Sequence, residues 1–163
     1  MPHLTTQDGV RLYYEHHAVS GARRRPTVIF SCAYCTTHEN WREQVAPLLA
    51  AGHPVVLWDL RGHGDSDSPT APDAWSIERV VDDLRTIADA TSPDAPIVAA
   101  GLSFGGLASL HFRTRHPARV AALVLIGSGP GFKNAEAAAA WAAQVERTAS
   151  FLETRGFAAF VAG

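Results

Sequence analysis

The feature that most constrains this chain is the sequence GLSFGG at residues 101–106. An apolar run, 96–100, precedes it, and a segment with helical character, 107–115, follows it. In a G-x-S-x-G sequence between a strand and a helix, the glycines leave room for a sharp turn that holds the serine in a strained backbone conformation. The start of the helix then offers a backbone N–H and a positive dipole to a developing oxyanion. The pattern predicts that Ser103 is a nucleophile.

A serine nucleophile also needs a base, and few histidines follow Ser103. Only His111 and His116 do so, and both fall in or at the end of the helix that runs away from the turn. We interpret His63 as a hydrogen-bonding residue of its own loop and Glu136 as a solvated helix residue. We therefore expect the acid and base of a catalytic triad to lie outside the 163 residues, and the chain alone to be inactive.

Composition describes an ordinary globular chain that is long enough for one core. Of its 163 residues 47% are hydrophobic and 18% charged, and the formal net charge of −2 gives no basic excess for nucleic acid. No run of about 18 apolar residues indicates a membrane span, and the N-terminus lacks the regions of a signal peptide. With two cysteines and no export signal, we expect a reducing cytoplasm and a cytoplasmic location.

Strand-like and helix-like segments alternate along the chain, which predicts an α/β fold with a mostly parallel sheet flanked by helices. Asp8 and Gly9 predict a tight hairpin turn, Gly52 a helix end, and Ser76 a helix N-cap. The expected strands are 4–6, 10–15, 27–30, 54–58, 95–100 and 120–126. The expected helices are 40–51, 77–88, 107–115 and 135–155. The three arginines at 23–25 predict a solvated loop.

Three motifs occur in a fixed order along the chain. FSCAY at 30–34 with the later Trp41 comes first, DLRGHGDS at 59–66 follows, and the turn at 101–106 comes last. In this combination the sequence resembles the first two thirds of an α/β-hydrolase. The resemblance implies the α/β-hydrolase fold, truncated after about the sixth strand. It divides the chain into the N-terminal part of the core, 1–131, and the start of a helical cap or lid, 132–163.

The resemblance further implies an esterase-like serine hydrolase that acts on a carboxylic ester or a related acyl or carbonyl compound, a small apolar molecule. Ser103 is then the nucleophile, and the backbone N–H groups of Phe104 and Tyr34 form the oxyanion hole. A serine at this turn argues against the branches with an aspartate nucleophile, the haloalkane dehalogenases and epoxide hydrolases. Serine relatives include esterases, lactonases, C–C bond hydrolases and cofactor-free haloperoxidases, and the sequence does not choose among them. No cofactor, metal, nucleic acid or membrane is implied.

The loop after the third strand departs from the family. Many members carry His-Gly where this chain has Cys32 and Ala33. Because alanine resists a positive φ, we expect the loop conformation to differ. Cys32 and Cys35 also form a C-x-x-C sequence, which fits a thioredoxin-like redox site, but that interpretation leaves the motifs at 59–66 and 101–106 unexplained. A zinc site would need two further ligands.

Two other classes of function stay open. One is a non-catalytic ligand binder or a remnant with the same fold, and the other is a half-protein that a complementing C-terminal segment completes. An apolar strand 120–126 left at the edge of the sheet would also favour self-association. Two local interpretations complete the expectations: Arg61 forms a loop network with Asp65 and Asp67, and the pair His38-Glu39 caps the helix at Trp41.

Overall fold

The computed structural model describes residues 2–19 and 25–162, so Arg23 and Arg24 of the expected solvated loop lie outside the described residues. The chain divides into two compact units, Met1–Pro130 and Gly131–Gly163. The first unit contains the sheet, and the second contains one long helical segment. In the described part of the chain, no helix is both long and apolar enough to cross a bilayer.

The sheet of the first unit has six strands within the described residues, in the order β1-β2-β4-β3-β5-β6. The pairs β1–β2 and β2–β4 are antiparallel, whereas β4, β3, β5 and β6 pair in parallel. The strands are β1 (His3–Thr5), β2 (Arg11–His17), β3 (Val28–Ser31), β4 (Val55–Trp58), β5 (Ile97–Leu102) and β6 (Val120–Ile126). The expected α/β fold with a mostly parallel sheet is confirmed.

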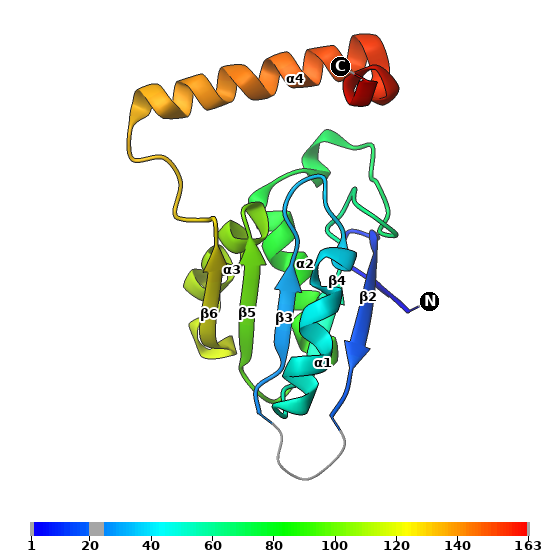
Figure 1. The fold of residues 1–163 in the computed structure, drawn as a ribbon, viewed down its shortest axis with the longest axis vertical. Helices are drawn as coiled ribbons and strands as arrows, with labels where there is room; N and C mark the ends of the chain where they lie inside the picture. Colours follow the sequence, from blue (N-terminus) through cyan, green and yellow to red (C-terminus); the bar gives the residue numbers. More distant parts are fainter. Residues whose placement is uncertain (1, 20–24, 163) are drawn as a thin grey trace. The chain divides into compact units, whose positions relative to one another are not determined.

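The central strands are almost entirely apolar because both faces of the sheet are covered. Val55 and Leu57 of β4 belong to the apolar cluster on the side of α1, while Val56 and Trp58 belong to the cluster on the other side. This alternation follows from the two-residue period of a strand. Helix α1 covers one face of the sheet and helices α2 and α3 cover the other (Figure 1). These helices are α1 (Arg42–Ala50), α2 (Ile77–Thr91) and α3 (Phe104–Arg115).

The helix ends follow the expected local signals in two cases. Ser76 caps α2, because its hydroxyl accepts a hydrogen bond from the Arg79 backbone N–H at 3.2 Å. Gly52, with φ +88°, ends α1 and donates its N–H to the Leu49 carbonyl at 2.9 Å. Three short 3₁₀ segments accompany the helices in the described residues: η1 (His38–Trp41), η2 (Pro72–Ala74) and η3 (Pro117–Arg119). The first turn of the expected helix 40–51 is therefore a 3₁₀ turn.

The second unit consists mainly of α4 (Ala135–Ala162). This element consists of two helices that meet at Gly156, whose φ of 76° and ψ of 166° are not helical, and the first of them covers the expected segment 135–155. The side-chain oxygen of Asn134 accepts the Glu136 N–H at 2.8 Å and so caps the helix start. Across the interruption, the rings of Phe151 and Phe160 lie 6.2 Å apart.

A buried ion pair joins the loop after β4 to helix α2. Arg61 is 2% exposed, and its guanidinium donates to both carboxylate oxygens of Asp83, at 2.7 and 2.6 Å. It also donates to Asp8 at 3.0 Å and to the Ala74 carbonyl at 2.7 Å. The hydrogen bond from Arg61 holds the pKa of Asp8 at about 2.

The expected network of Arg61 with Asp65 and Asp67 is wrong. Asp67 binds Arg11 of β2 instead, with an Nη2–Oδ1 distance of 2.8 Å. Arg61 turns inward because α2 presents a fully buried carboxylate, Asp83, which needs a positive partner. The pairing of Arg61 with Asp83 could not be predicted from the local sequence, since Asp83 lies in the next helix.

The neighbouring residues Asp82 and Asp83 allow a matched test of this buried pair. Asp83→Asn removes the fully buried carboxylate that pairs with Arg61 and leaves it only the partly exposed Asp8, which should lower the free energy of unfolding by about 3–5 kcal/mol. Asp82 is 43% exposed and lies 3.7 Å from Arg115, so Asp82→Asn should cost only about 0–1 kcal/mol. Urea titrations of both variants at one protein concentration measure the difference. Equal losses in the two variants would contradict a stabilising role for the buried pair.

Candidate active site

The turn between β5 and α3 holds Ser103 in a strained conformation. Its φ of 50° and ψ of −116° are outside the regions that L-residues usually adopt, and such a residue costs about 1–3 kcal/mol. The Ser103 N–H donates to the Ile126 carbonyl of β6 at 2.9 Å, and its carbonyl accepts the Leu107 N–H at 3.1 Å. The side chain is exposed. The strain expected from the sequence is therefore present, and it presents the hydroxyl to solvent.

Two glycines make this turn possible by close approach of backbone to backbone. A Cβ atom on Gly101 would collide with the backbone of Gly105. A Cβ atom on Gly105 would collide with the carbonyl oxygen of Ser31 and come within 2.5 Å of that of Cys32. The start of α3 therefore lies directly against the end of β3. This contact also brings the loop after β3 to the residue that follows Ser103.

The two expected oxyanion donors, Phe104 and Tyr34, are brought together by this contact. Phe104 is the first residue of α3, where a helix leaves its N–H groups without intrahelical partners. Tyr34 lies in the turn after β3, and within the described residues neither N–H has a protein acceptor. The two rings stack with centroids 4.3 Å apart and an interplanar angle of 21°. The sequence analysis missed this stack, although an aromatic residue in each motif was a visible signal.

The loop after β3 contains a residue with a left-handed backbone conformation, but this residue is not Ala33. Cys35 has a φ of 58°, while Ala33 has no positive φ. Cys32 is 1% exposed, and burial raises the pKa of its thiol to about 12. Cys35 is exposed, and both cysteines are free thiols. A buried thiol with a raised pKa is the opposite of the activated thiolate that redox catalysis uses.

Two of the histidines weighed as a base, His116 and His63, make contacts of their own. His116 packs on Phe112 with ring centroids 5.1 Å apart, and burial lowers the pKa of its imidazole. His63 Nδ1 lies 3.0 Å from the Arg61 carbonyl, within its own loop. In residues 2–19 and 25–162, the structure gives the Ser103 hydroxyl no hydrogen-bond partner. The same residues contain no cluster of three or more histidine, cysteine or acidic side chains arranged to hold a metal ion.

His38 is the buried titratable residue that the sequence analysis misjudged. It does not cap α1, which has no side-chain cap among the described residues. Its backbone N–H donates to Asp59 Oδ1 at 2.7 Å, and its Nδ1 lies 2.9 Å from Asp59 Oδ2. Asp59 is fully buried and also accepts the Asp65 N–H at 3.0 Å. The carboxylate draws His38 inward because a buried charge must be paired.

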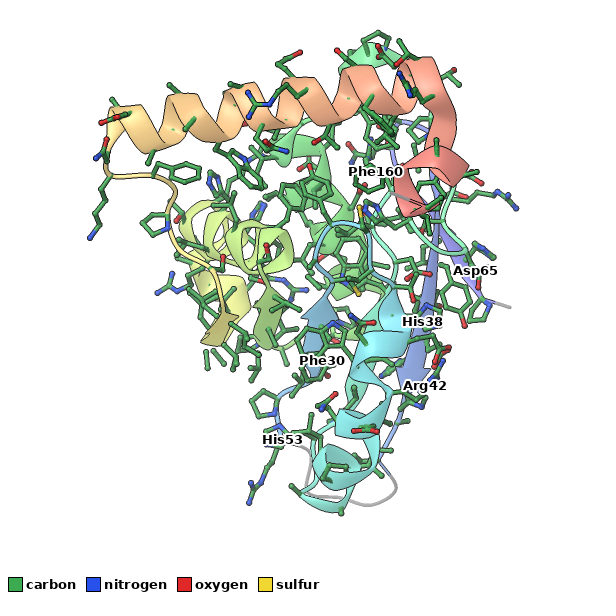
Figure 2. All side chains as sticks on the ribbon, turned by 45° about the horizontal axis from the view of Figure 1, so that its top comes forward. Phe30, His38, Arg42, His53, Asp65 and Phe160 are labelled. Atoms are coloured by element: carbon green, nitrogen blue, oxygen red, sulfur yellow. The ribbon has the colours of Figure 1, made fainter. Side chains whose placement is uncertain are left out.

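A second set of polar contacts, between Arg42 and Glu15, holds the same part of the chain as His38. Arg42 donates to both carboxylate oxygens of Glu15 on β2, at 2.5 and 2.9 Å. Glu15 also accepts hydrogen bonds from Tyr13 at 2.8 Å and interacts with His17 at 2.9 Å. Burial alone would raise the pKa of Glu15, but these partners lower it to about 2. Figure 2 shows His38 and Arg42 on the side of η1 and α1 that faces β2. The two residues fix the far end of the loop that carries Tyr34.

Two cavities of the first unit lie at different ends of the sheet. A cavity of about 120 Å³ is lined by Tyr34 and Phe104, beside the strained turn. A larger one of about 440 Å³ is lined by Thr27, Pro54 and Pro96, at the N-terminal ends of the parallel strands. Open α/β sheets bind ligands outside the carboxyl ends of their strands. The smaller cavity is therefore the one that bears on the chemistry of Ser103.

Comparisons with known proteins agree with this geometry. A family model described as the alpha/beta hydrolase fold matches residues 26–155. The protein named "Putative carbamate hydrolase RutD" of Variovorax paradoxus is 37% identical over 115 residues, which are 69% of this chain and 42% of the relative. Epoxide hydrolase 1 of Siraitia grosvenorii is 30% identical over 65% of this chain and 33% of its own length. The chain thus spans less than half the length of these relatives.

A solved structure is also similar to this chain in fold. The enol-lactonase from Burkholderia xenovorans LB400 has a TM-score of 0.79 and 26% identity, covering 98% of this chain and 56% of that one.

The ion pair of Glu15 predicts a pH-dependent stability. Glu15→Gln removes a carboxylate whose pKa falls from 4.5 to about 2 on folding, a shift worth at most about 3 kcal/mol. Because Arg42 is 42% exposed, solvent screening should reduce the loss at pH 7 to about 1–2 kcal/mol. A depressed pKa stabilises above pH 4.5, and that stabilisation disappears as the pH falls toward 2. Urea unfolding from pH 7 to pH 3 measures the difference in the free energy of unfolding between wild type and variant. This difference should become smaller below pH 4.5.

Glu43→Gln provides the control for this prediction. Glu43 is an exposed residue of the same helix, α1, with no ion pair in the described structure. Its substitution should change stability by less than about 0.5 kcal/mol at every pH. A difference for Glu15→Gln that stayed constant from pH 7 to pH 3 would show that the carboxylate charge does not stabilise the loop.

Proposed function

The chain belongs to the alpha/beta hydrolase fold family, and on that premise we propose that it carries the nucleophile of a serine hydrolase acting on a carboxylic ester or a related acyl or carbonyl compound. The observation that carries the proposal is the strained, exposed Ser103 at the start of α3, next to the stacked residues Phe104 and Tyr34. Strain of this kind persists only where the surroundings fix it, and it gathers at functional sites.

The proposed reaction has two steps. Ser103 Oγ attacks the substrate carbonyl while a base takes the hydroxyl proton, and the oxyanion accepts hydrogen bonds from the Phe104 and Tyr34 N–H groups. The tetrahedral intermediate collapses, the alcohol leaves with the proton from the base, and an acyl-serine remains. Water then attacks the acyl-serine, the base takes a proton from that water, and the acid product leaves as Ser103 regains its proton.

We propose that the base and its orienting acid lie in polypeptide outside these 163 residues, either in the same chain or in a complementing segment. Two observations support this. His63 Nδ1 is engaged by the Arg61 carbonyl, and His116 packs on the Phe112 ring. The relative of Variovorax paradoxus is also more than twice as long as the part that matches.

The kind of substrate follows from the residue at the turn. Some relatives are named epoxide hydrolases, others carbamate hydrolase or enol-lactonase. A serine nucleophile forms an acyl intermediate from a carbonyl compound, so we propose the ester-type chemistry for this chain. The substrate is a small apolar molecule, and neither a membrane nor a nucleic acid takes part. A cytoplasmic location is part of the same proposal.

Two further features belong to the proposal. Residues 132–163 are proposed to begin a cap over the substrate, which would bury the exposed apolar side chains of α4 such as Trp141 and Phe157. The strand β6 is proposed to favour self-association of the chain. In the described residues it pairs only with β5, and its Val124 and Ile126 are each 43% exposed.

The proposal predicts how activity depends on Ser103. The purified 163-residue chain should hydrolyse a p-nitrophenyl ester at no more than the buffer rate, because it lacks the base. In the whole protein, with base and acid present, Ser103→Ala should lower kcat on the order of 10⁴-fold or more. Ser68→Ala, an exposed serine of the loop after β4, should leave kcat within about twofold.

The same assay separates the hydrolase from the redox alternative. Replacing Cys32 and Cys35 together by serine should leave kcat within about tenfold, because neither thiol does the chemistry. Two results together would favour a thioredoxin-like function over a hydrolase. The cysteine variant would lose as much activity as Ser103→Ala, and the wild type would reduce disulfide substrates.

A further inference from the structure

We propose that the cavity beside Tyr34 and Phe104 binds one aromatic ring of the substrate, and that His63 accepts a hydrogen bond from a hydroxyl group on that ring. The inference deepens the proposed function and rests on it in one respect: the ring would belong to a phenolic ester or lactone. The binding itself needs no catalysis. The substrate class is thereby narrowed to compounds with a single hydroxylated ring next to the reacting carbonyl.

The size and lining of the cavity suit a single ring. Its volume is about 120 Å³. A closed apolar cavity of about 150 Å³ accommodates benzene in a protein core, and the cavity here opens to solvent. Tyr34, Phe104 and Trp75 supply aromatic surface, and Leu60 and Val80 add buried aliphatic side chains. Aromatic rings prefer offset or edge contacts with other rings, so this lining favours a flat aromatic group over a puckered aliphatic one.

The aromatic wall formed by Trp75 is held in place although it is 46% exposed. The tip of its indole lies on the backbone of Gly62, since a Cβ atom there would lie only 2.5 Å from Trp75 Cη2. The residue before it, Ala74, is tied by its carbonyl to the buried Arg61 at 2.7 Å. Trp75 and the exposed Tyr34 line the same cavity, and exposed apolar side chains gathered in one place mark a binding surface.

A further wall of the cavity is the stack of Tyr34 on Phe104. Tyr34 is 59% exposed, yet its ring lies against Phe104 at 4.3 Å between centroids and near His63 at 5.8 Å. Phe104 directly follows Ser103, and the Tyr34 N–H is a proposed oxyanion donor. A ring in the cavity would therefore contact the residue that follows the proposed nucleophile.

Of the two basic residues that line the cavity, His63 rather than Arg61 offers an unoccupied polar atom. Arg61 also lines the cavity, but all five of its N–H donors are used by Asp83, Asp8 and the Ala74 carbonyl. His63 Nδ1 must donate to the Arg61 carbonyl, because a carbonyl oxygen only accepts. In the neutral imidazole, Nε2 is then an acceptor, and no described residue occupies it. A phenolic hydroxyl is the matching donor.

The test uses three ring compounds of similar size with the 163-residue chain. Phenol, toluene and methylcyclohexane are titrated and followed by nuclear magnetic resonance, which gives a Kd for each compound. Phenol should bind at least threefold more tightly than toluene, and toluene at least threefold more tightly than methylcyclohexane. Equal affinities for toluene and methylcyclohexane would overturn the aromatic preference.

Variants locate the site. Ile77→Trp places a larger side chain in the cavity lining and should weaken phenol binding at least tenfold. His63→Leu should remove the preference for phenol over toluene without changing the Kd of toluene more than about twofold. Ala90→Trp, at an exposed position of the same helix α2 and outside the cavity lining, is the matched control and should leave all three Kd values unchanged. Unchanged phenol binding in a folded Ile77→Trp chain would overturn the assignment of the cavity.

A second variant covers the case in which Ile77→Trp does not fold. Trp75→Ala removes an exposed wall, and it should weaken phenol binding while admitting the larger 2-naphthol. If the chain binds the ring compounds but the whole protein is inactive on esters, this inference is supported and the proposed function is contradicted. If the whole protein hydrolyses esters through Ser103 but the chain binds no ring compound, the proposed function is supported and this inference is contradicted.

Discussion

The contact between the start of α3 and the end of β3 is the constraint on which the rest of the site depends. It exists because Gly105 has no side chain, so that its backbone lies on the carbonyl oxygens of Ser31 and Cys32. The strained Ser103 stands at the head of α3, and the loop with Tyr34 continues from β3. One backbone contact therefore sets the positions of the proposed nucleophile and of both proposed oxyanion donors.

Charged residues then fix the loop that the glycine contact only begins to place. The loop after β3 runs from the sheet to η1, where Asp59 holds His38 and Glu15 holds Arg42. Its middle part carries the ring of Tyr34, stacked on Phe104. The loop is thus held at both ends and in the middle, which is the rigidity that an oxyanion hole requires.

The sequence predicted features that depend on neighbouring residues and missed those that depend on distant ones. The strained turn at Ser103, the cap at Ser76 and the helix end at Gly52 each follow from a few adjacent residues. The partner of Arg61 is 22 residues away in α2, and His38 and Asp59 are 21 apart. Alternation and glycine patterns carry no information on such pairs, because a buried carboxylate accepts any donor that the fold brings to it.

Covalent trapping of the nucleophile tests the central claim most directly. The whole protein is incubated with a fluorophosphonate, digested, and its peptides are analysed by mass spectrometry. A serine with an activated hydroxyl attacks phosphorus as it attacks a carbonyl, displaces fluoride and keeps the phosphonyl group. The account predicts one modified residue, Ser103, with loss of esterase activity in proportion to labelling. Loss of activity with the label on another residue, or ester hydrolysis that persists when Ser103 is fully labelled, would contradict it.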